Sequence, residues 1–274
     1  MKNILKCNGE LVTVNGHKIH IYRDGNEDAP TIVVMSGHCT VAPVYDFKVL
    51  YEKLLSSFKV IVIEKFGYGY SDIFDSPCDI DTLVSIQRQA LAVLGEAGPY
   101  ILVPHSMSGL EAIRWKQEFP GEVSAIIGID MATPLSFSVW TDKQIKQTVL
   151  LMKVLRGLKL ASVLSSVTNL SLTDDEFEQH KLLKKRNTFN ICCINEAREV
   201  LNNARVVGED VDIQCPMLMF SSNGEDQEKD WVVNQEKFAS SMGARLISYD
   251  CGHYIHHFKS DEMRNEIIEF VNSL

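Results

Sequence analysis

Ser106 lies in a sequence context that could make its hydroxyl group a nucleophile. The segment Pro104-His105-Ser106-Met107-Ser108-Gly109 follows a short apolar run and opens a helical pattern. In a strand–turn–helix arrangement of this kind, the tight turn lifts the hydroxyl above the sheet, and the helix amino terminus supplies backbone N–H groups. We therefore predict that Ser106 attacks a carbonyl carbon, although an ordinary turn with a serine N-cap would have the same sequence.

The residues two positions before and two after Ser106 decide whether such a turn can close, because little space is left there. The usual pattern is Gly-x-Ser-x-Gly, and in this chain Pro104 replaces the first glycine and Ser108 the second. Serine is small, so Ser108 is compatible with the turn. Proline departs further from the pattern, because its ring needs space and fixes φ.

His253 is the candidate general base for Ser106. Gly252-His253 follows the apolar run Arg245–Tyr249 and precedes the last helical pattern. A histidine after the last strand fits the chain order nucleophile, acid, histidine. We predict that His253 accepts the Ser106 proton, whereas His256 and His257 begin the next turn and take no part.

Short apolar runs alternate with amphipathic stretches along most of the chain. Runs of this length, flanked by turn residues and rich in β-branched side chains, are typical of strands buried on both faces. The predicted strands are Glu10–Val14, His17–Tyr22, Thr31–Met35, Lys59–Glu64, Tyr100–Val103, Ala125–Ile129, Met217–Phe220 and Arg245–Tyr249, of which the first two form a hairpin at Asn15-Gly16. The predicted helices between them are Asp46–Leu55, Asp81–Ala97, Met107–Phe119, Asp230–Met242 and Asp261–Leu274. This alternation predicts an α/β fold with a mostly parallel, eight-stranded sheet covered by helices on both faces.

The stretch from Pro134 to Val206 interrupts this alternation. It contains helical patterns at Trp140–Lys159, Asp174–Lys185 and Phe189–Val206, and no convincing strand. With 11 Lys and Arg against 7 Asp and Glu its net charge is +4, whereas the remainder, with 16 against 29, carries −13. We predict a helical cap over residues 134–206, inserted into a core of residues 1–133 and 207–274, above the carboxyl ends of the strands. Beneath it we expect an apolar pocket lined partly by residues 150–158.

Several segments, in the correct order and spacing, resemble the α/β-hydrolase superfamily of capped esterases and lipases. They are Met35-Ser36-Gly37-His38, similar to the family's oxyanion turn; Glu64–Asp72 (EKFGYGYSD), similar to Asp-x-x-Gly-x-Gly-x-Ser-Asp; Glu118–Val123 (EFPGEV), at the end of the helix after the nucleophile; and Gly252-His253. The resemblance extends over nearly the whole chain. It implies the α/β-hydrolase fold.

The resemblance also implies which atoms would stabilise an oxyanion. The backbone N–H groups of His38 and Met107 stand at the two positions that donate hydrogen bonds in this family. Each such donor lowers the activation barrier by roughly 3 kcal/mol. The side chains of His38 and Cys39 either line the same pocket or only pack locally.

The acid that would orient His253 has two possible places in the sequence. The commonest family position follows the strand Met217–Phe220, where the loop Ser221–Gln227 offers Glu225 or Asp226 in an ambiguous register. Some lipases of the superfamily instead take the acid from the strand after the nucleophile helix, and Gly128–Pro134 (GIDMATP) resembles their turn. We predict Asp130 as the acid and keep Glu225 and Asp226 as alternatives.

A serine nucleophile predicts acyl transfer through a covalent acyl-enzyme. Epoxide hydrolases and haloalkane dehalogenases of similar architecture use an aspartate nucleophile. Ser106 at this position argues against both reactions. We expect a carboxylic ester of a small or lipophilic, lipid-like substrate, because no charged specificity motif is present; amide or iminopeptidase substrates are the alternative. A non-catalytic ligand-binding receptor of the same fold is a second hypothesis. A membrane-associated lipase that uses an apolar face with Val149, Met152 and Leu155 is a third.

The composition argues against several other classes of protein. The formal net charge of −9 is not that of a nucleic-acid-binding protein. The seven cysteines form neither an even disulfide framework nor a zinc-binding spacing, so we expect free thiols and no metal or other cofactor. Residues 1–14 lack the apolar core of a signal peptide, and the most apolar stretch, Val149–Val167, is interrupted by basic residues. We therefore predict a cytoplasmic protein with no membrane span.

Overall fold

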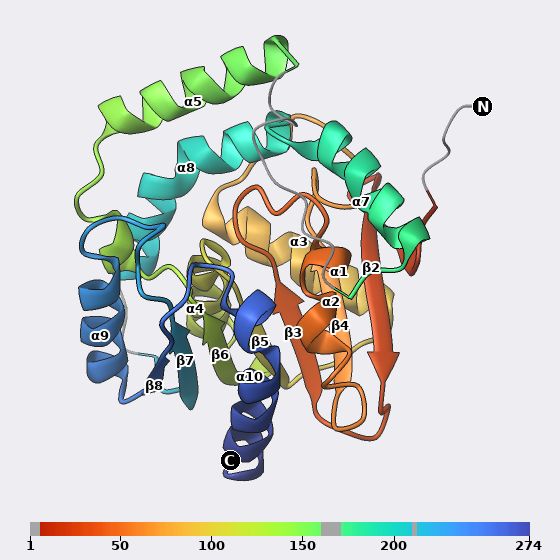
Figure 1. The fold of residues 1–274 in the computed structure, drawn as a ribbon, viewed down its shortest axis with the longest axis vertical. Helices are drawn as coiled ribbons and strands as arrows, with labels where there is room; N and C mark the ends of the chain where they lie inside the picture. The colour runs from red at the N-terminus through yellow and green to blue at the C-terminus, as the bar shows by residue number, and fades with distance from the viewer. Residues whose placement is uncertain (1–5, 160–170, 210–212) are drawn as a thin grey trace.

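A sheet of eight strands forms the centre of the computed structural model, which describes residues 6–159, 171–209 and 213–274 (Figure 1). The strands are β1 (Glu10–Val14), β2 (His17–Gly25), β3 (Thr31–Met35), β4 (Lys59–Glu64), β5 (Tyr100–Pro104), β6 (Val123–Ile129), β7 (Met217–Ser221) and β8 (Arg245–Ser248). Their order across the sheet is β1-β2-β4-β3-β5-β6-β7-β8. β2 runs antiparallel to β1 and β4, and the other neighbours are parallel. The predicted mostly parallel, eight-stranded sheet is confirmed.

The helices lie close to their predicted ranges, with two differences. They are α1 (Pro43–Asp46), α2 (Lys48–Tyr51), α3 (Ile80–Val93), α4 (Ser108–Glu118), α5 (Asp142–Gly157), α7 (Asp174–Asn187), α8 (Ile191–Gly208), α9 (Trp231–Met242) and α10 (Ile255–Asn272), with 3-10 turns η1 (Pro120–Glu122) and η2 (Pro134–Phe137). The single helix predicted over Asp46–Leu55 is wrong: α1 ends at Asp46, α2 covers only Lys48–Tyr51, and Phe47 lies between them. The last helix begins at Ile255 rather than Asp261, and Lys259 (φ −127°) bends it near the predicted start.

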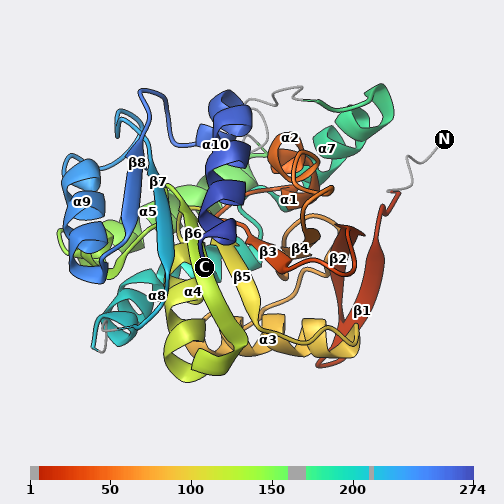
Figure 2. The same cartoon turned by 90° about the horizontal axis from the view of Figure 1, so that it is seen from below.

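Both faces of the sheet are buried, and β3 shows why its pattern is a continuous apolar run. Val33 and Met35 pack into the core that contains the inner sides of α3 and α4. Ile32 and Val34 point the other way, into the core formed with α2 and α10. Figure 2 shows α3 and α4 on one side of the sheet and α1, α2 and α10 on the other. Since successive side chains face opposite helical layers, none of them can be polar without cost.

Helices α5, α7 and α8 make up most of the described part of residues 134–206, and no strand is present there. Figure 1 shows them at the top, beyond one end of the sheet. The arrow of β2 points away from them, and the parallel strands run opposite to β2, so the carboxyl ends of the parallel strands face these helices. α5 packs on α8 through a buried apolar cluster that includes Val149, Met152 and Ala197.

We expected residues 150–158 to line an apolar pocket beneath the cap, but most of the apolar side chains in this part of α5 are exposed. Met152 is buried, but Leu150, Leu151, Val154 and Leu158 each leave between 46% and 62% of their surface exposed. The inward-facing side is formed instead by Ile145, Val149 and Met152, which are the residues spaced for the α8 contact. Within the described residues, no helix combines the length and apolar composition needed to cross a bilayer.

Candidate active site

Ser106 occupies a sharp turn between β5 and α4. Its φ is +53°, in the left-handed region that non-glycine residues rarely adopt. The turn is held by a hydrogen bond from Ser106 N to Ile129 O (3.3 Å) and by one from Ala132 N to Ser106 O (2.7 Å). Strained backbone of this kind persists only where the surroundings fix it, and it is frequent at functional sites.

The two departures from the Gly-x-Ser-x-Gly pattern are both accommodated. Pro104 ends β5, and the strand ladder continues through the next residue, whose amide (His105 N) donates to Met35 O (3.0 Å). The hydroxyl of Ser108 is fully buried, accepts from His105 N (3.0 Å) and lies 2.8 Å from Met35 O. Ser108 therefore ties the start of α4 to the end of β3, a contact that the sequence pattern did not predict.

Two glycines let neighbouring backbone approach the turn closely. A Cβ atom placed on Gly37 would lie 2.6 Å from the Cβ of Ser106, closer than real Cβ atoms come. A Cβ atom on Gly109 would overlap Ala132 O, in the loop after β6. Any other residue at either position would push the loop after β3 or the loop after β6 away from Ser106.

The backbone N–H groups of His38 and Met107 are free to bind a ligand atom. In the described part of the chain, neither donates a hydrogen bond. The turn that carries His38 is fixed on both sides. Cys39, at φ +60°, donates its N–H to Tyr68 Oη (3.1 Å), and Nε2 of His38 lies 2.9 Å from Cys193 O on α8.

Asp130 and His253 form a close pair, with Asp130 Oδ2 2.6 Å from His253 Nδ1. Asp130 directly follows β6, has a φ of +42° and is completely buried. Its second oxygen accepts hydrogen bonds from Ser222 N and Trp231 Nε1, both at 2.9 Å. Three donors thus fix the carboxylate, and the carboxylate in turn fixes the tautomer in which Nδ1 of His253 carries the proton.

The other two candidate carboxylates lie elsewhere. Glu225 and Asp226 are exposed residues in the turn after β7. Asp226 Oδ2 lies against Gly252, where an added Cβ would be 2.5 Å away. Among the described hydrogen bonds and ion pairs of His253, the carboxylate partner is Asp130, and neither Glu225 nor Asp226 takes part.

His105, the residue before Ser106, contacts His253. His105 Nε2 lies 3.3 Å from the backbone oxygen of His253, and the two imidazole rings are 4.6 Å apart. Burial, with a smaller contribution from His253, lowers the pKa of His105 well below its usual value, so this ring is neutral. No hydrogen bond joins Ser106 Oγ to His253 within the described residues, and such contacts are often long before a substrate binds.

Solved structures of other proteins share this arrangement of strands and helices. A haloalkane dehalogenase loop variant from Bradyrhizobium elkanii superposes with a TM-score of 0.72 over 96% of this chain and 96% of that one, at 14% sequence identity. An enol-lactonase from Burkholderia xenovorans LB400 superposes with a TM-score of 0.66 over 96% of this chain and all of that one, at 18% identity. This chain has the α/β-hydrolase fold. Ser106, Asp130 and His253 therefore come from three segments that the α/β-hydrolase fold brings to one edge of its sheet.

Comparison by sequence adds a relative without a described activity. The chain is 29% identical to the uncharacterised protein YbdG of Bacillus subtilis (strain 168), in an alignment that covers 99% of this chain and 88% of YbdG. No protein-family model matches the chain.

A buried ion network lies beside the site in this α/β-hydrolase fold. Lys65 Nζ contacts Glu111 Oε1 on α4 (2.7 Å) and Glu196 Oε1 on α8 (2.5 Å), and the other oxygen of Glu196 accepts from Tyr68 Oη. Burial alone would lower the pKa of Lys65, but attraction by the two carboxylates outweighs it and raises that pKa. For Glu196, burial acts to raise the pKa, but Lys65 and neighbouring groups outweigh this effect, so the pKa of Glu196 is lowered. The network thus links α4, α8 and, through Tyr68, the turn with His38; Lys65, Glu111 and Glu196 were not expected from the sequence.

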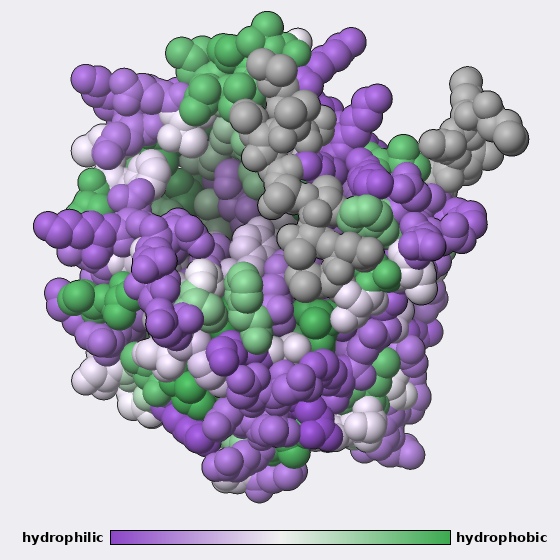
Figure 3. Space-filling model, viewed as in Figure 1, coloured by the Kyte–Doolittle hydropathy of each residue, from purple (hydrophilic) through white to green (hydrophobic). Residues whose placement is uncertain are grey.

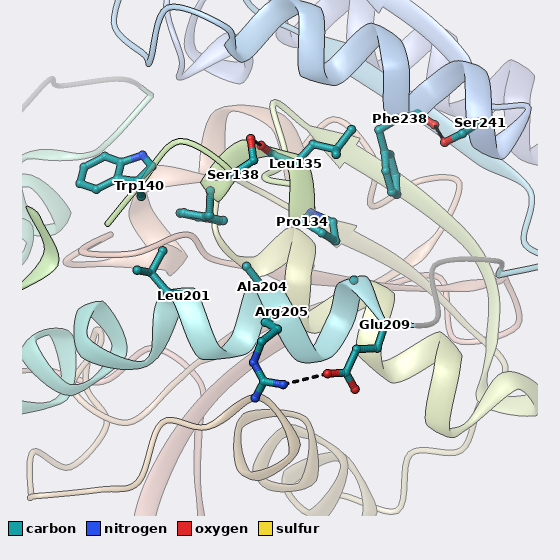
Figure 4. A pocket seen from close by; sticks show the side chains of 12 residues that line it. Pro134, Leu135, Ser138, Trp140, Leu201, Ala204, Arg205, Glu209, Phe238 and Ser241 are labelled. Atoms are coloured by element: carbon teal, nitrogen blue, oxygen red, sulfur yellow. Dashed lines mark hydrogen bonds and ion pairs between the residues drawn. The ribbon is translucent and has the colours of Figure 1, made fainter. Parts of the chain in front are cut away.

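An apolar cleft of about 680 Å³ lies apart from these residues (Figure 4). Side chains of η2, α8 and α9 line it, including Pro134, Leu135, Leu201 and Phe238, and the ion pair Arg205–Glu209 (2.8 Å) closes one side. Ser106, Asp130 and His253 do not line this cleft, so its size says nothing about the site around Ser106. Within the described residues, no group of three His, Cys, Asp or Glu side chains is arranged to hold a metal ion.

Proposed function

We propose that the protein is a serine hydrolase that cleaves a carboxylic ester of a small or lipophilic substrate. The observation that carries this proposal is the close pair Asp130–His253 (2.6 Å), in which the backbone oxygen of His253 lies 3.3 Å from the ring of His105, the residue before Ser106 (φ +53°). A neutral imidazole with Nδ1 fixed by a carboxylate has Nε2 left to accept a proton.

In the proposed reaction, Ser106 Oγ attacks the ester carbonyl carbon and its proton passes to Nε2 of His253. Asp130 stabilises the imidazolium that forms, and the N–H groups of His38 and Met107 stabilise the oxyanion. The C–O bond then breaks, the alcohol leaves with the proton from His253, and an acyl-enzyme remains. A water molecule, deprotonated by His253, attacks the acyl carbon and releases the acid and Ser106.

The serine nucleophile, a lactonase among the structural neighbours and the apolar surroundings of Met107 support an ester substrate. Ser106 replaces the aspartate that dehalogenases of this architecture use, and one structural neighbour is an enol-lactonase, whose name denotes a cyclic ester substrate. Met107 and Cys39 pack against the apolar cluster formed by α5, α8 and Tyr68. We propose that these helices, within residues 134–206, act as a cap over Ser106 and favour an apolar acyl group.

Ser106→Ala tests this proposal. The variant should fold normally and lose at least about a thousandfold in kcat for short p-nitrophenyl esters, because no nucleophile remains. A fluorophosphonate probe should label the wild-type chain and not the variant. Ser124→Ala is the matched control, since its hydroxyl bonds Tyr100 O (3.1 Å) at the start of β5, away from Ser106, and should be dispensable for turnover.

Three outcomes would contradict the proposal. Undiminished ester hydrolysis by Ser106→Ala would show that Ser106 is not the nucleophile. Labelling of Ser106 without turnover of any ester would favour a ligand-binding receptor. Turnover of amides or amino-terminal proline peptides in place of esters would leave the nucleophile correct and the substrate class wrong.

A further inference from the structure

Helix α5 is apolar on two sides, and the described residues cover only one of them. Ile145, Val149 and Met152 are buried against α8. On the opposite side, Leu150, Leu151, Val154 and Leu158 recur at the spacing of one helical face and are 62%, 58%, 46% and 62% exposed. Figure 3 shows this apolar patch at the top of the molecule. Monomeric proteins rarely leave contiguous apolar patches uncovered unless they mark an interaction site.

A groove lined by basic side chains adjoins the patch. It runs between α5 and α8, has a volume of about 430 Å³, and is lined by Lys146, Lys153 and Arg198. The apolar side chains Ile145, Val149 and Leu150 and the carboxylate of Asp142 also line it. Leu150 belongs both to the groove and to the exposed patch, so the two form one continuous surface.

The basic side chains of this groove are available to an external anion. Neither Lys146 nor Lys153 is ion-paired with a described carboxylate, and the one described partner of Arg198 is the amide oxygen of Asn195 (2.8 Å). Elsewhere on the molecule, exposed Lys and Arg side chains commonly have acidic partners, as in Arg205–Glu209 and Lys181–Glu178. A groove with three basic side chains and one carboxylate, beside a leucine-rich face, is complementary to an anionic amphiphile.

We propose that α5 and this groove dock on a lipid bilayer that contains anionic lipids. Lys146, Lys153 and Arg198 would contact the phosphate groups, while Leu150, Leu151, Val154 and Leu158 enter the boundary between headgroups and acyl chains. A helix with leucines on one face and lysines along its edge lies in the plane of a bilayer in this way. Since no described helix could span a bilayer, the contact would be peripheral.

The charge distribution supports the same orientation. Residues 134–206 carry a net charge of +4 and the remainder −13. An anionic surface would therefore attract the side of the molecule with α5 and repel the rest. At physiological ionic strength the Debye length is about 8 Å. Repulsion between the bilayer and the acidic groups far from it is therefore largely screened, whereas the basic groups next to the bilayer still interact with it.

Vesicle co-sedimentation of the full chain tests this proposal. The wild-type protein should sediment with vesicles of phosphatidylcholine and phosphatidylglycerol, and much less with pure phosphatidylcholine or at high salt. Lys146→Glu/Lys153→Glu should weaken the partition coefficient at least about tenfold, since each basic group at such a surface contributes about fivefold. Leu150→Gln/Leu151→Gln should weaken the partition coefficient at least tenfold as well, because two leucine side chains no longer transfer from water into the bilayer.

Matched variants on other surfaces separate the docking face from general changes in charge and hydropathy. Lys229→Glu/Lys237→Glu changes the net charge equally, and Leu11→Gln/Val233→Gln replaces two other exposed apolar side chains. Both should bind like the wild type, and circular dichroism should show all four variants folded. The proposal is wrong if the α5 variants bind vesicles like these controls, or if the wild type does not bind vesicles that contain anionic lipid. It is equally wrong if sedimentation velocity shows a dimer that only the α5 variants dissociate, because the face would then bind a second copy.

Discussion

At Asp130 a left-handed backbone, complete burial and three hydrogen bonds act on one carboxylate. Its φ is +42°, and Ser222 N and Trp231 Nε1 hold one oxygen while the other faces His253. A carboxylate restrained in this way orients an imidazole more firmly than an exposed loop residue would. The residue-level hypothesis is therefore that Asp130 completes the catalytic group.

Asp130→Asn should lower kcat by orders of magnitude, because the neutral amide favours the wrong tautomer of His253 and no longer stabilises the imidazolium. Glu225→Gln and Asp226→Asn should each leave kcat nearly unchanged, since both side chains are exposed and make no bond to His253. Steady-state kinetics on one p-nitrophenyl ester compares the three variants. If either loop variant is the inactive one, the acid belongs to the loop after β7.

Residues of the site differ in how far the sequence reveals them. Ser106, His253 and Asp130 follow strands and stand in short motifs, so their order along the chain is informative. Both candidate loops follow neighbouring strands. Asp130 is favoured over Glu225 and Asp226 because it directly follows its strand in a turn that resembles the lipase one, whereas the other loop has no unambiguous acid. Lys65 stands at a variable position of the segment Glu64–Asp72, so that motif does not mark it. Its partners Glu111 and Glu196 are 46 and 131 positions away, and only the packing of α4 against α8 brings them together.

Among the elements, the turn after β3 depends on contacts with segments far from it in sequence. Cys39 N–H bonds Tyr68 Oη, Tyr68 bonds Glu196, and Glu196 is held by Lys65. Glu111, the second partner of Lys65, lies on the first turn of α4, just after Met107. Both proposed oxyanion donors, His38 N–H and Met107 N–H, thus belong to segments anchored to one buried ammonium group.

Tyr68→Phe tests whether this anchoring positions the donors. The variant leaves Cys39 N–H without its acceptor, and a displacement of about 1 Å at a reacting group can cost about a hundredfold in rate. We expect kcat to fall roughly 10- to 100-fold with a much smaller change in KM, because oxyanion donors act mainly in the transition state. Steady-state kinetics over a range of ester concentrations measures both.

Tyr70→Phe is the control, since Tyr70 lies in the same loop and its hydroxyl bonds Tyr45 (2.7 Å) rather than the turn. It should keep the wild-type kcat. A Tyr68→Phe variant with reduced thermal stability but an unchanged kcat would mean that the hydroxyl supports the fold and not the donors.

At the level of the elements the sequence also had clear limits. The strands were predictable because burial on both faces forces short apolar runs, as in β4, whose six residues are all buried. The helix over Asp46–Leu55 was wrong because an amphipathic pattern does not show where a helix is interrupted or ends, here at Phe47 and after Tyr51. The orientation of α5 was misjudged for a related reason: a helix with apolar residues on two sides gives no sign of which side is covered.

Across the whole molecule, the histidines at the end of the chain and around Ser106 tie its stability to pH. His105 and His256 are buried, and burial, reinforced by neighbouring histidines, lowers the pKa of each well below its usual value. The groups around them are His253, Tyr254, His257 and Phe47, with Asp46 contacting His257 Nε2 through its backbone oxygen (3.0 Å). The folded state therefore holds both rings neutral, while the unfolded chain protonates them near pH 6.5.

Stability should accordingly fall as the medium is acidified. Above about pH 6.5 both states have neutral rings and this contribution is fully present; below it the unfolded chain binds more protons, so the free energy of unfolding decreases. Each such histidine contributes a slope of up to about 1.4 kcal/mol per pH unit until the folded pKa is reached. His256→Gln cannot be protonated, so between about pH 6.5 and about pH 5 its free energy of unfolding should fall less steeply than that of the wild type, by up to that amount. Urea denaturation across this range measures the slopes. Equal slopes for the two proteins would show that His256 takes up no extra proton on unfolding, and the acid sensitivity would then arise from other groups.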